Sequence, residues 1–137
     1  MRALGVDFGM KRVGLAVCDP TETLCSPLTT IQRTSRQALF DELLKIIQNE
    51  KIQAVVVGLP LSLDGEDTLT TRQARNFAES LARRTDVPVH LWDERLTSAQ
   101  AEEELDMAGV YGKKRKQALD SQAATIILRS WLESAHS

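Results

Sequence analysis

The stretch GVDFGMKRVGLAVCD, residues 5–19, decides how this chain folds. It holds two apolar runs separated by a short turn that contains a glycine, which predicts a β-hairpin with strands over residues 3–8 and 12–18. One carboxylate, Asp7, stands between two apolar residues where the first strand ends. An ionised carboxylate is costly to bury unless a cation or hydrogen-bond donors compensate it. Asp7 is therefore either a turn residue or a ligand of something positive.

Downstream of the hairpin, apolar runs alternate with helical periodicity. The early hairpin indicates antiparallel pairing, and the later strand–helix–strand units indicate parallel pairing with right-handed crossovers. These patterns predict an α/β fold in which a mixed five-stranded sheet is flanked by helices. The expected elements are a strand over 28–32, a helix capped by Thr34 and Gln37 that runs to about Asn49, a strand over 53–60, a helix over 68–84, a strand over 87–92, a helix capped by Thr97 and Gln100 that ends near Gly109, and a helix over 116–133.

The length and composition are those of one globular domain over residues 1–137. Hydrophobic residues make up 42% and charged residues 26%, so the chain can bury one sizeable core. No apolar run approaches the ~20 residues of a membrane span, and the N-terminus has no signal-peptide pattern. The two cysteines, Cys18 and Cys25, lack the spacing of a metal site. We expect a soluble protein of the cytoplasm.

The net charge is −2, so a polyanionic partner would have to be attracted by local basic patches. The densest patch is GKKRK at 112–116, and a second one, Lys11 with Arg12, follows the carboxylate in the hairpin. These patches predict nucleic-acid contacts through Lys11, Arg12, Lys113, Lys114, Arg115 and Lys116, with a solvated protein surface as the alternative explanation.

Three acidic positions stand at places where a charge is unusual. Asp7 ends the first strand, Asp93 and Glu94 end the last strand, and Asp120 heads an apolar stripe of the final helix. Each has a plain structural explanation when taken alone: a turn, solvated loop charges, or a carboxylate favoured at a helix start. If the two strands are neighbours and the last helix packs beside them, however, all of these acids meet at one end of the sheet.

Carboxylates held together repel one another, and they stay ionised only if a multivalent cation binds them. Oxygen ligands without histidine or thiolate favour Mg²⁺ or Mn²⁺, bound as one or two ions. Neither His90 nor His136 has the spacing of a ligand pair. A carboxylate–metal centre with basic residues around it suits phosphodiester hydrolysis. The sequence therefore indicates a divalent-metal-dependent nuclease.

Four short motifs resemble, in the same order, those of the YqgF/RuvX family of bacterial proteins. They are DFG at 7–9, VVGLP at 56–60 followed by DG at 64–65, DERLT at 93–97 and DSQAA at 120–124. The resemblance runs from about residue 3 to residue 132. It implies a ribonuclease H-like fold, a relationship to Holliday-junction resolvases, and a nuclease that processes the 5′ end of precursor 16S rRNA in ribosome biogenesis.

The resemblance also implies roles for individual residues. Asp7, Glu94 and Asp120 would be the catalytic metal ligands, and Glu94 is preferred to Asp93 on the resemblance alone. Arg95 would steady the scissile phosphate or pair with a neighbouring acid. Related resolvases carry two acids one turn apart on the last helix, whereas the position three after Asp120 is Ala123. Either three carboxylates suffice, or Asp93 supplies the fourth.

Other functions remain open from the sequence. A junction resolvase would cut branched DNA as a dimer, whereas an rRNA-processing enzyme would act on precursor rRNA or a ribosomal particle as a monomer or a homodimer. A strand–DFG–turn–strand unit also resembles the phosphate hairpin of actin-like and sugar-kinase proteins, which place two such domains around a cleft. A non-catalytic ribosome-assembly factor would keep the acids as structural groups.

Overall fold

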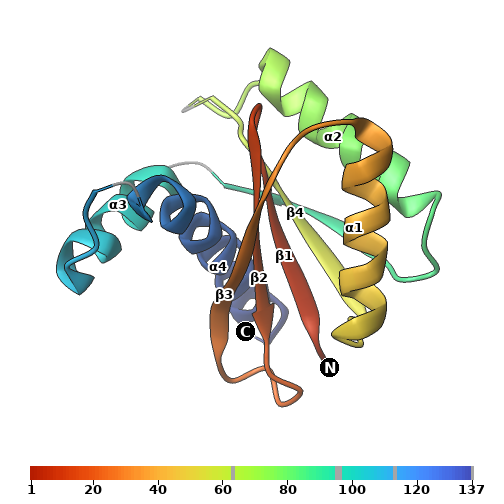
Figure 1. Ribbon diagram of the computed structural model, residues 1–137, viewed down its shortest axis with the longest axis horizontal. Coiled ribbons are helices and arrows are strands. Elements are labelled where there is room, and N and C mark those ends of the chain that lie inside the picture. The colour runs from red at the N-terminus through yellow and green to blue at the C-terminus, as the bar shows by residue number, and fades with distance from the viewer. Residues whose placement is uncertain (63, 95–96, 113, 137) are drawn as a thin grey trace.

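A mixed β-sheet forms the centre of the protein, with helices on both of its faces (Figure 1). The computed structural model describes residues 1–62, 64–94, 97–112 and 114–136, and of residues 97–99, 114, 116, 117, 135 and 136 it describes the backbone only. The described elements are β1 (Ala3–Phe8), β2 (Arg12–Cys18), β3 (Cys25–Gln32), α1 (Arg36–Asn49), β4 (Ala54–Leu59), α2 (Leu69–Ala82), β5 (Val89–Asp93), α3 (Thr97–Ala108) and α4 (Lys114–His136).

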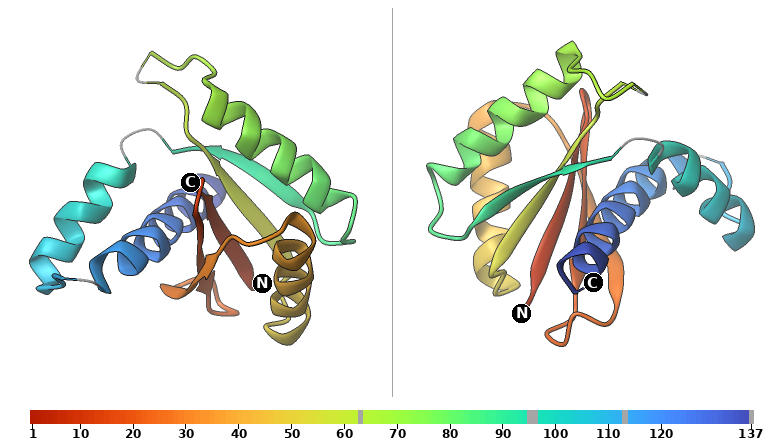
Figure 2. Two further views of the ribbon diagram at one scale, coloured as in Figure 1. Left: turned by 45° about the horizontal axis from the view of Figure 1, so that its top comes forward. Right: turned by 180° about the vertical axis from the view of Figure 1, so that it is seen from behind.

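The strands lie in the order β3-β2-β1-β4-β5. β1, β2 and β3 pair antiparallel, whereas β4 pairs parallel with both β1 and β5. The predicted five-stranded mixed sheet is confirmed. Helices α1 and α2 cover one face, α4 covers the other, and α3 packs against α4 as an arm that projects from the sheet (Figure 2). No helix in the described part of the chain has the length and apolar character needed to cross a membrane.

Side-chain alternation along β1 separates the two halves of the core. Leu4 and Val6 lie in the apolar cluster beneath α1 and α2, together with Leu15, Val55 and Phe77. The intervening residues face α4, where the strands contribute mostly small side chains to a second cluster. Asp7 has the parity of Ala3 and Gly5. It therefore belongs to the face that α4 covers.

Glycines on this face bring the backbone of α4 close to the sheet. A Cβ atom placed on Gly5 would lie 2.6 Å from the carbonyl oxygen of Ala124, and one placed on Gly14 would lie 2.0 Å from that of Asp120. Real Cβ atoms do not approach other atoms this closely, so α4 packs against β1 and β2 almost backbone to backbone. The middle of α4, from Asp120 to Leu128, is fixed by this contact.

Several boundaries differ from the sequence-based expectation. Strand β3 begins at Cys25, because residues 25–27 continue the pairing with β2. The N-cap of α1 is Ser35 and not Thr34: the Ser35 hydroxyl accepts a hydrogen bond from the Ala38 amide at 3.1 Å. Helix α4 is longer at both ends than predicted.

We predict that Gly14→Ala lowers the free energy of unfolding strongly, by about 3 kcal/mol or more, because the added methyl group meets helix backbone that cannot rotate away. Thermal and urea denaturation measure the change. Gly58→Ala is the matched control. Its methyl group would lie 2.5 Å from Ile127 Cδ1, a side-chain end that can move, so its loss should be clearly smaller. Equal stability of the Gly14→Ala and wild-type proteins would contradict this account of how α4 packs.

Candidate active site

Two carboxyl groups, those of Asp7 and Glu94, meet at the carboxyl end of β1. Asp7 is paired across the sheet with Gly14, which has no side chain to obstruct it. Glu94 comes directly after β5, and its amide donates a hydrogen bond to the Leu59 carbonyl at 3.1 Å, which continues the parallel pairing of β4 and β5. A side-chain hydrogen bond joins the two carboxyl groups. Residues 87 positions apart in the sequence thus share one site.

Gly58 in β4 provides the space that the Glu94 side chain occupies. A Cβ atom on Gly58 would lie 2.9 Å from both Cδ and Oε2 of Glu94. Gly58 also has the parity of Ala54 and Val56, whose side chains face α4. A larger residue at this position would displace the Glu94 carboxylate from the site.

The alternation of β5 decides between the two acids at its end. Trp92 packs on the α4 side of the sheet, where its indole Nε1 donates to the Ser130 hydroxyl at 3.1 Å. The His90 ring, two positions earlier, lies 5.1 Å from the Trp131 ring. Glu94 continues this set of even positions, whereas Asp93 belongs to the alternate set and is exposed. The sequence held this signal, since even positions of the strand carry its aromatic side chains.

Asp120 approaches the pair from α4 and is held there by an arginine. Its Oδ2 atom lies 2.6 Å from Nε of Arg12. Arg12 stands two positions before Gly14 in β2, so it also belongs to the face that α4 covers. The charge of Asp120 acts on Asp7. Helix α4, whose close approach depends on Gly14, thus brings a third carboxylate to the same end of the sheet.

The site strongly perturbs the two buried acids. Burial, and then the charge of Asp120, raise the pKa of Asp7 to about 6, although its hydrogen bond with Glu94 acts in the opposite direction. Burial, and then the charge of Asp7, raise the pKa of Glu94 to about 9. At neutral pH Glu94 therefore keeps a proton and donates it in a hydrogen bond to the Asp7 carboxylate.

The three acids offer only oxygen atoms to a ligand. Within the described residues, no three acidic, histidine or cysteine side chains stand close enough together to surround an ion as they are, and Asp120 is turned to Arg12. The His90 ring lies tilted against Trp131, and the two cysteines are cross-strand partners at the opposite end of β2 and β3. The donor set available at this end of the sheet is thus purely carboxylate, which suits Mg²⁺ or Mn²⁺ and not zinc.

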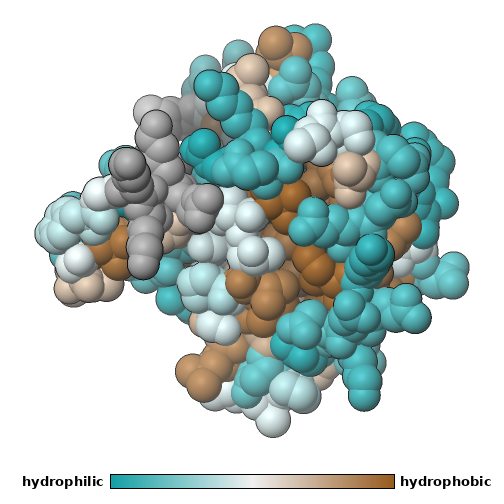
Figure 3. Space-filling view, viewed as in Figure 1, coloured by the Kyte–Doolittle hydropathy of each residue, from teal (hydrophilic) through white to brown (hydrophobic). Residues whose placement is uncertain are grey.

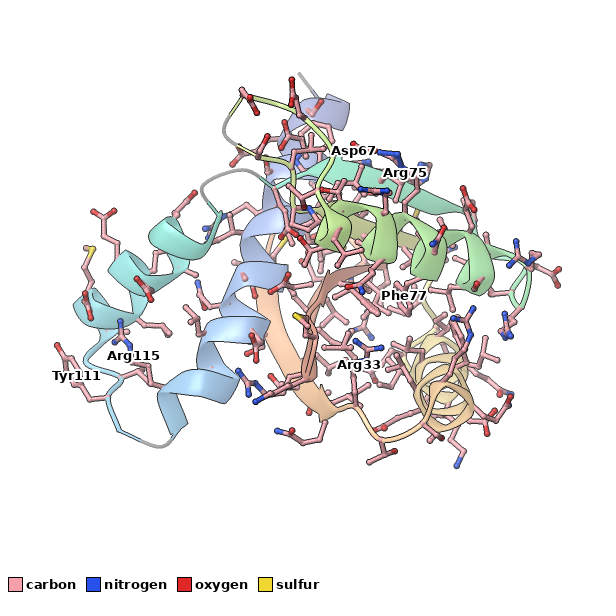
Figure 4. The ribbon with its side chains drawn as sticks, turned by 90° about the horizontal axis from the view of Figure 1, so that it is seen from above. Arg33, Asp67, Arg75, Phe77, Tyr111 and Arg115 are labelled. Atoms are coloured by element: carbon pink, nitrogen blue, oxygen red, sulfur yellow. The ribbon has the colours of Figure 1, made fainter. Side chains whose placement is uncertain are left out.

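The basic residues predicted from the sequence lie in different surroundings. Lys11 is exposed at the tip of the hairpin. Arg115 is engaged within the α3–α4 arm, where it pairs with Asp106 at 2.9 Å and donates to the carbonyl of Val110 at 2.8 Å. Figure 4 shows Arg115 beside Tyr111 at the outer end of this arm. Arg95 and Lys113, and the side chains of Thr97, Lys114 and Lys116, lie outside what the structure describes.

Two of the elements that assemble the site were not expected from the sequence. These are the space that Gly58 leaves for Glu94 and the pairing of Arg12 with Asp120. The signal for the glycines was their parity: Gly5, Gly14 and Gly58 occupy the same face as alanines in strands that are otherwise rich in valine and leucine. The pairing of Arg12 carried no local signal, since its partner is 108 positions away.

Comparison with known proteins gives consistent matches over nearly the whole chain. The model of the family RuvX, described as Holliday junction resolvase, matches residues 1–134. A protein of Maridesulfovibrio salexigens named "Putative pre-16S rRNA nuclease" is 61% identical over 135 residues, which cover 98% of this chain and 100% of that protein.

Two solved structures support the assignment of the fold. Thermus thermophilus RuvC, in complex with a Holliday junction substrate, superposes with a TM-score of 0.63 at 18% identity and covers 100% of this chain and 97% of that one. The fowlpox virus resolvase in its complex with Holliday junction DNA gives a TM-score of 0.57 at 12% identity, with full coverage of both chains. The predicted ribonuclease H-like fold is thereby confirmed.

We predict that Glu94→Gln stabilises the metal-free protein at pH 8. The pKa of Glu94 is raised from 4.5 to about 9, so folding takes up a proton between these values and loses stability as the pH rises, by at most about 1.4 kcal/mol per pH unit. The neutral amide keeps the hydrogen bond to Asp7 without this cost. Melting temperatures in chelator at pH 4 and pH 8 measure the effect, which should disappear at pH 4. A Glu94→Gln protein that is less stable than wild type at pH 8 would show that the raised pKa of Glu94 does not cost the wild-type protein stability at this pH.

Proposed function

The chain belongs to the RuvX family, and from that premise we propose that it is a divalent-metal-dependent endonuclease that hydrolyses phosphodiester bonds of precursor 16S rRNA. The single observation that carries the proposal is the hydrogen-bonded pair of Asp7 and Glu94, with the charge of Asp120 near enough to raise the pKa of Asp7. A pair of acids that must share a proton does not stabilise the fold, whereas a metal-dependent enzyme uses such a pair to bind its cation.

Asp7, Glu94 and Asp120 would hold one or two Mg²⁺ or Mn²⁺ ions, without Asp93, which belongs to the alternate set of positions at the end of β5. The chemical fit rests on the purely carboxylate donor set and on the repulsion within it, which a divalent cation relieves. When bound, the metal supplies activation of the attacking water and stabilisation of the leaving oxygen.

The protein's own residues prepare the site in three ways. Glu94 would have to lose its proton to act as a ligand, which would link loading of the site to pH. Arg12 of β2 keeps the Asp120 carboxylate oriented by pairing with it. Gly14 lets α4 bring Asp120 close to β2, and Gly58 leaves the space that Glu94 occupies, so the acids are positioned by packed elements of regular structure.

Precursor rRNA is the favoured substrate because of the name that the Maridesulfovibrio relative carries. Branched DNA is the second candidate, favoured by the description of the family as a Holliday junction resolvase. We propose that Lys11, Arg12, Arg95 and the basic segment 113–116 contact the phosphates of the nucleic acid. Residues 1–137 would act as one domain in the cytoplasm, as a monomer or a homodimer, with ribosomal particles as partners.

We predict that Asp7→Asn abolishes cleavage of a precursor 16S rRNA fragment while the protein stays folded, because the substitution removes charge without changing volume. Cleavage is measured with Mg²⁺ or Mn²⁺, with a four-way DNA junction as parallel substrate, and Mn²⁺ binding is measured by calorimetry. Asp67→Asn is the matched control, since Asp67 lies on the surface in a pair with Arg75 at 3.2 Å (Figure 4). Full activity of the Asp7→Asn protein would refute the proposal, and cleavage of the junction alone would move the substrate to DNA.

We predict that replacing Lys113, Lys114 and Lys116 together by Gln weakens RNA binding and flattens its dependence on salt. Each phosphate contact of a single strand contributes about 0.7 to the slope of log K against log salt, so three lost contacts should reduce the slope by about 2. Arg115 is left in place because it ties α3 to α4. Lys45→Gln, an exposed change in α1, should leave the slope unaltered. An unchanged slope in the triple variant would assign the segment to a solvated surface.

A further inference from the structure

A cavity of about 250 Å³ lies on the face of the sheet opposite the acids. Its walls come from the end of β1, from the hairpin turn, from the start of α1 and from α2, and Phe8, Phe40 and Phe77 form its apolar part. The ring centroids of Phe8 and Phe77 are 4.4 Å apart, and those of Phe40 and Phe77 are 5.7 Å apart in a stacked arrangement. Apolar surface shows among polar side chains between the hairpin and α1 (Figure 3).

Two arginines border this aromatic cluster. The guanidinium carbon of Arg33 lies 4.4 Å from the centroid of the Phe8 ring, and that of Arg36 lies 5.3 Å from the Phe40 ring. In the part of the chain that the structure describes, no carboxylate stands within ion-pair distance of either side chain. Figure 4 shows Arg33 and Phe77 directed toward the same region between α2 and α1. The cavity thus combines aromatic faces with uncompensated positive charge.

This lining matches the chemistry of a single nucleotide. Aromatic rings and guanidinium planes stack on the face of an unpaired base, and amides such as those of Gln73 and Asn76 can bond to its edge. The arginines suit the adjoining phosphate. The volume is just below the range of about 300–1,000 Å³ found for whole small-molecule ligands, so the cavity suits one base and not a larger cofactor.

The position of the cavity connects it with the acids. Asp7 and Phe8 are consecutive residues, with Cα atoms about 3.8 Å apart, and strand alternation sends their side chains to opposite faces of the sheet. Arg33 also holds the turn that follows, since its guanidinium donates to the carbonyls of Gly9 at 2.9 Å and Met10 at 3.0 Å. A nucleic-acid strand that crosses the end of β1 would therefore pass both the acids and the cavity.

We propose that this cavity binds one unpaired base of the substrate RNA, close in the strand to the phosphate that is cleaved. The inference rests on the proposed nuclease function and adds a substrate requirement to it: the strand must present an unstacked nucleotide at this position. Fully paired RNA would fill the acidic site without filling the cavity. Selection of the cleavage position then depends on α1, α2 and the hairpin as well as on the catalytic acids.

The test uses the Asp7→Asn protein, which binds without cleaving, and a 12-nucleotide single-stranded RNA that carries one 2-aminopurine, moved along the strand in a series. We expect the fluorescence of 2-aminopurine to change strongly at one position of the series. The double variant Arg36→Gln with Asn76→Ala, both exposed positions, should abolish that change and weaken RNA binding about tenfold. The matched double variant Lys45→Gln with Gln48→Ala, on exposed positions of α1 that do not line the cavity, should behave as its parent.

A second measurement separates failure of the cavity from failure of the nuclease proposal. Adenosine 5′-monophosphate is titrated into the wild-type protein while NMR follows the side-chain amides of Gln73 and Asn76, which should shift. If RNA binds but no 2-aminopurine position responds, the cavity proposal is overturned and the nuclease function stands, even where the mononucleotide shifts both amides. If RNA is neither bound nor cleaved, the nuclease proposal fails. Shifted amides would then still support a base site, and unshifted amides would overturn it.

Discussion

The close approach of α4 to the sheet is the contact on which the rest of the structure depends. It is possible only because Gly5 and Gly14 carry no side chain toward the helix backbone. Backbone-to-backbone packing fixes both the position and the rotation of a helix, since no side chain lies between that could adjust. The place of Asp120 relative to Asp7 is therefore set by two missing methyl groups in the hairpin and not by any attraction between the acids, which repel each other.

Because its acids repel one another, the site lowers the stability of the folded protein. Asp7 and Glu94 are buried on a rigid sheet, and they fold only by keeping a proton that neither would keep in water at neutral pH. The surrounding core supplies the free energy for this arrangement through two apolar clusters, one on each face. Arg12 offsets only the charge of Asp120 and leaves the pair of Asp7 and Glu94 uncompensated. The imbalance is what a divalent cation would correct.

The sequence predicted the elements and the sheet well, because apolar runs, turns and helical periodicity are local signals. It also predicted that Asp7, the end of β5 and Asp120 would meet if β1 and β5 were neighbours. That premise is wrong, because β4 lies between the two strands, and Glu94 reaches Asp7 only over Gly58 of β4. The finer features depend on pairs far apart in the chain. The contact of Arg12 with Asp120 and the space that Gly58 leaves for Glu94 have no local pattern. The choice between Asp93 and Glu94 lay within reach, because His90, Trp92 and Glu94 share one parity.

Strand alternation also connects the two faces at this end of the sheet. A strand presents successive side chains to opposite faces, so two adjacent residues can serve the acidic site on one face and the aromatic cavity on the other. Asp7 contributes to the acidic side and Phe8 to the aromatic side, while Arg33 fastens the turn that both precede. Any movement of the hairpin tip would shift both surfaces together. Binding on the aromatic face is thus mechanically connected to the carboxylates, through one peptide unit and not through a long pathway.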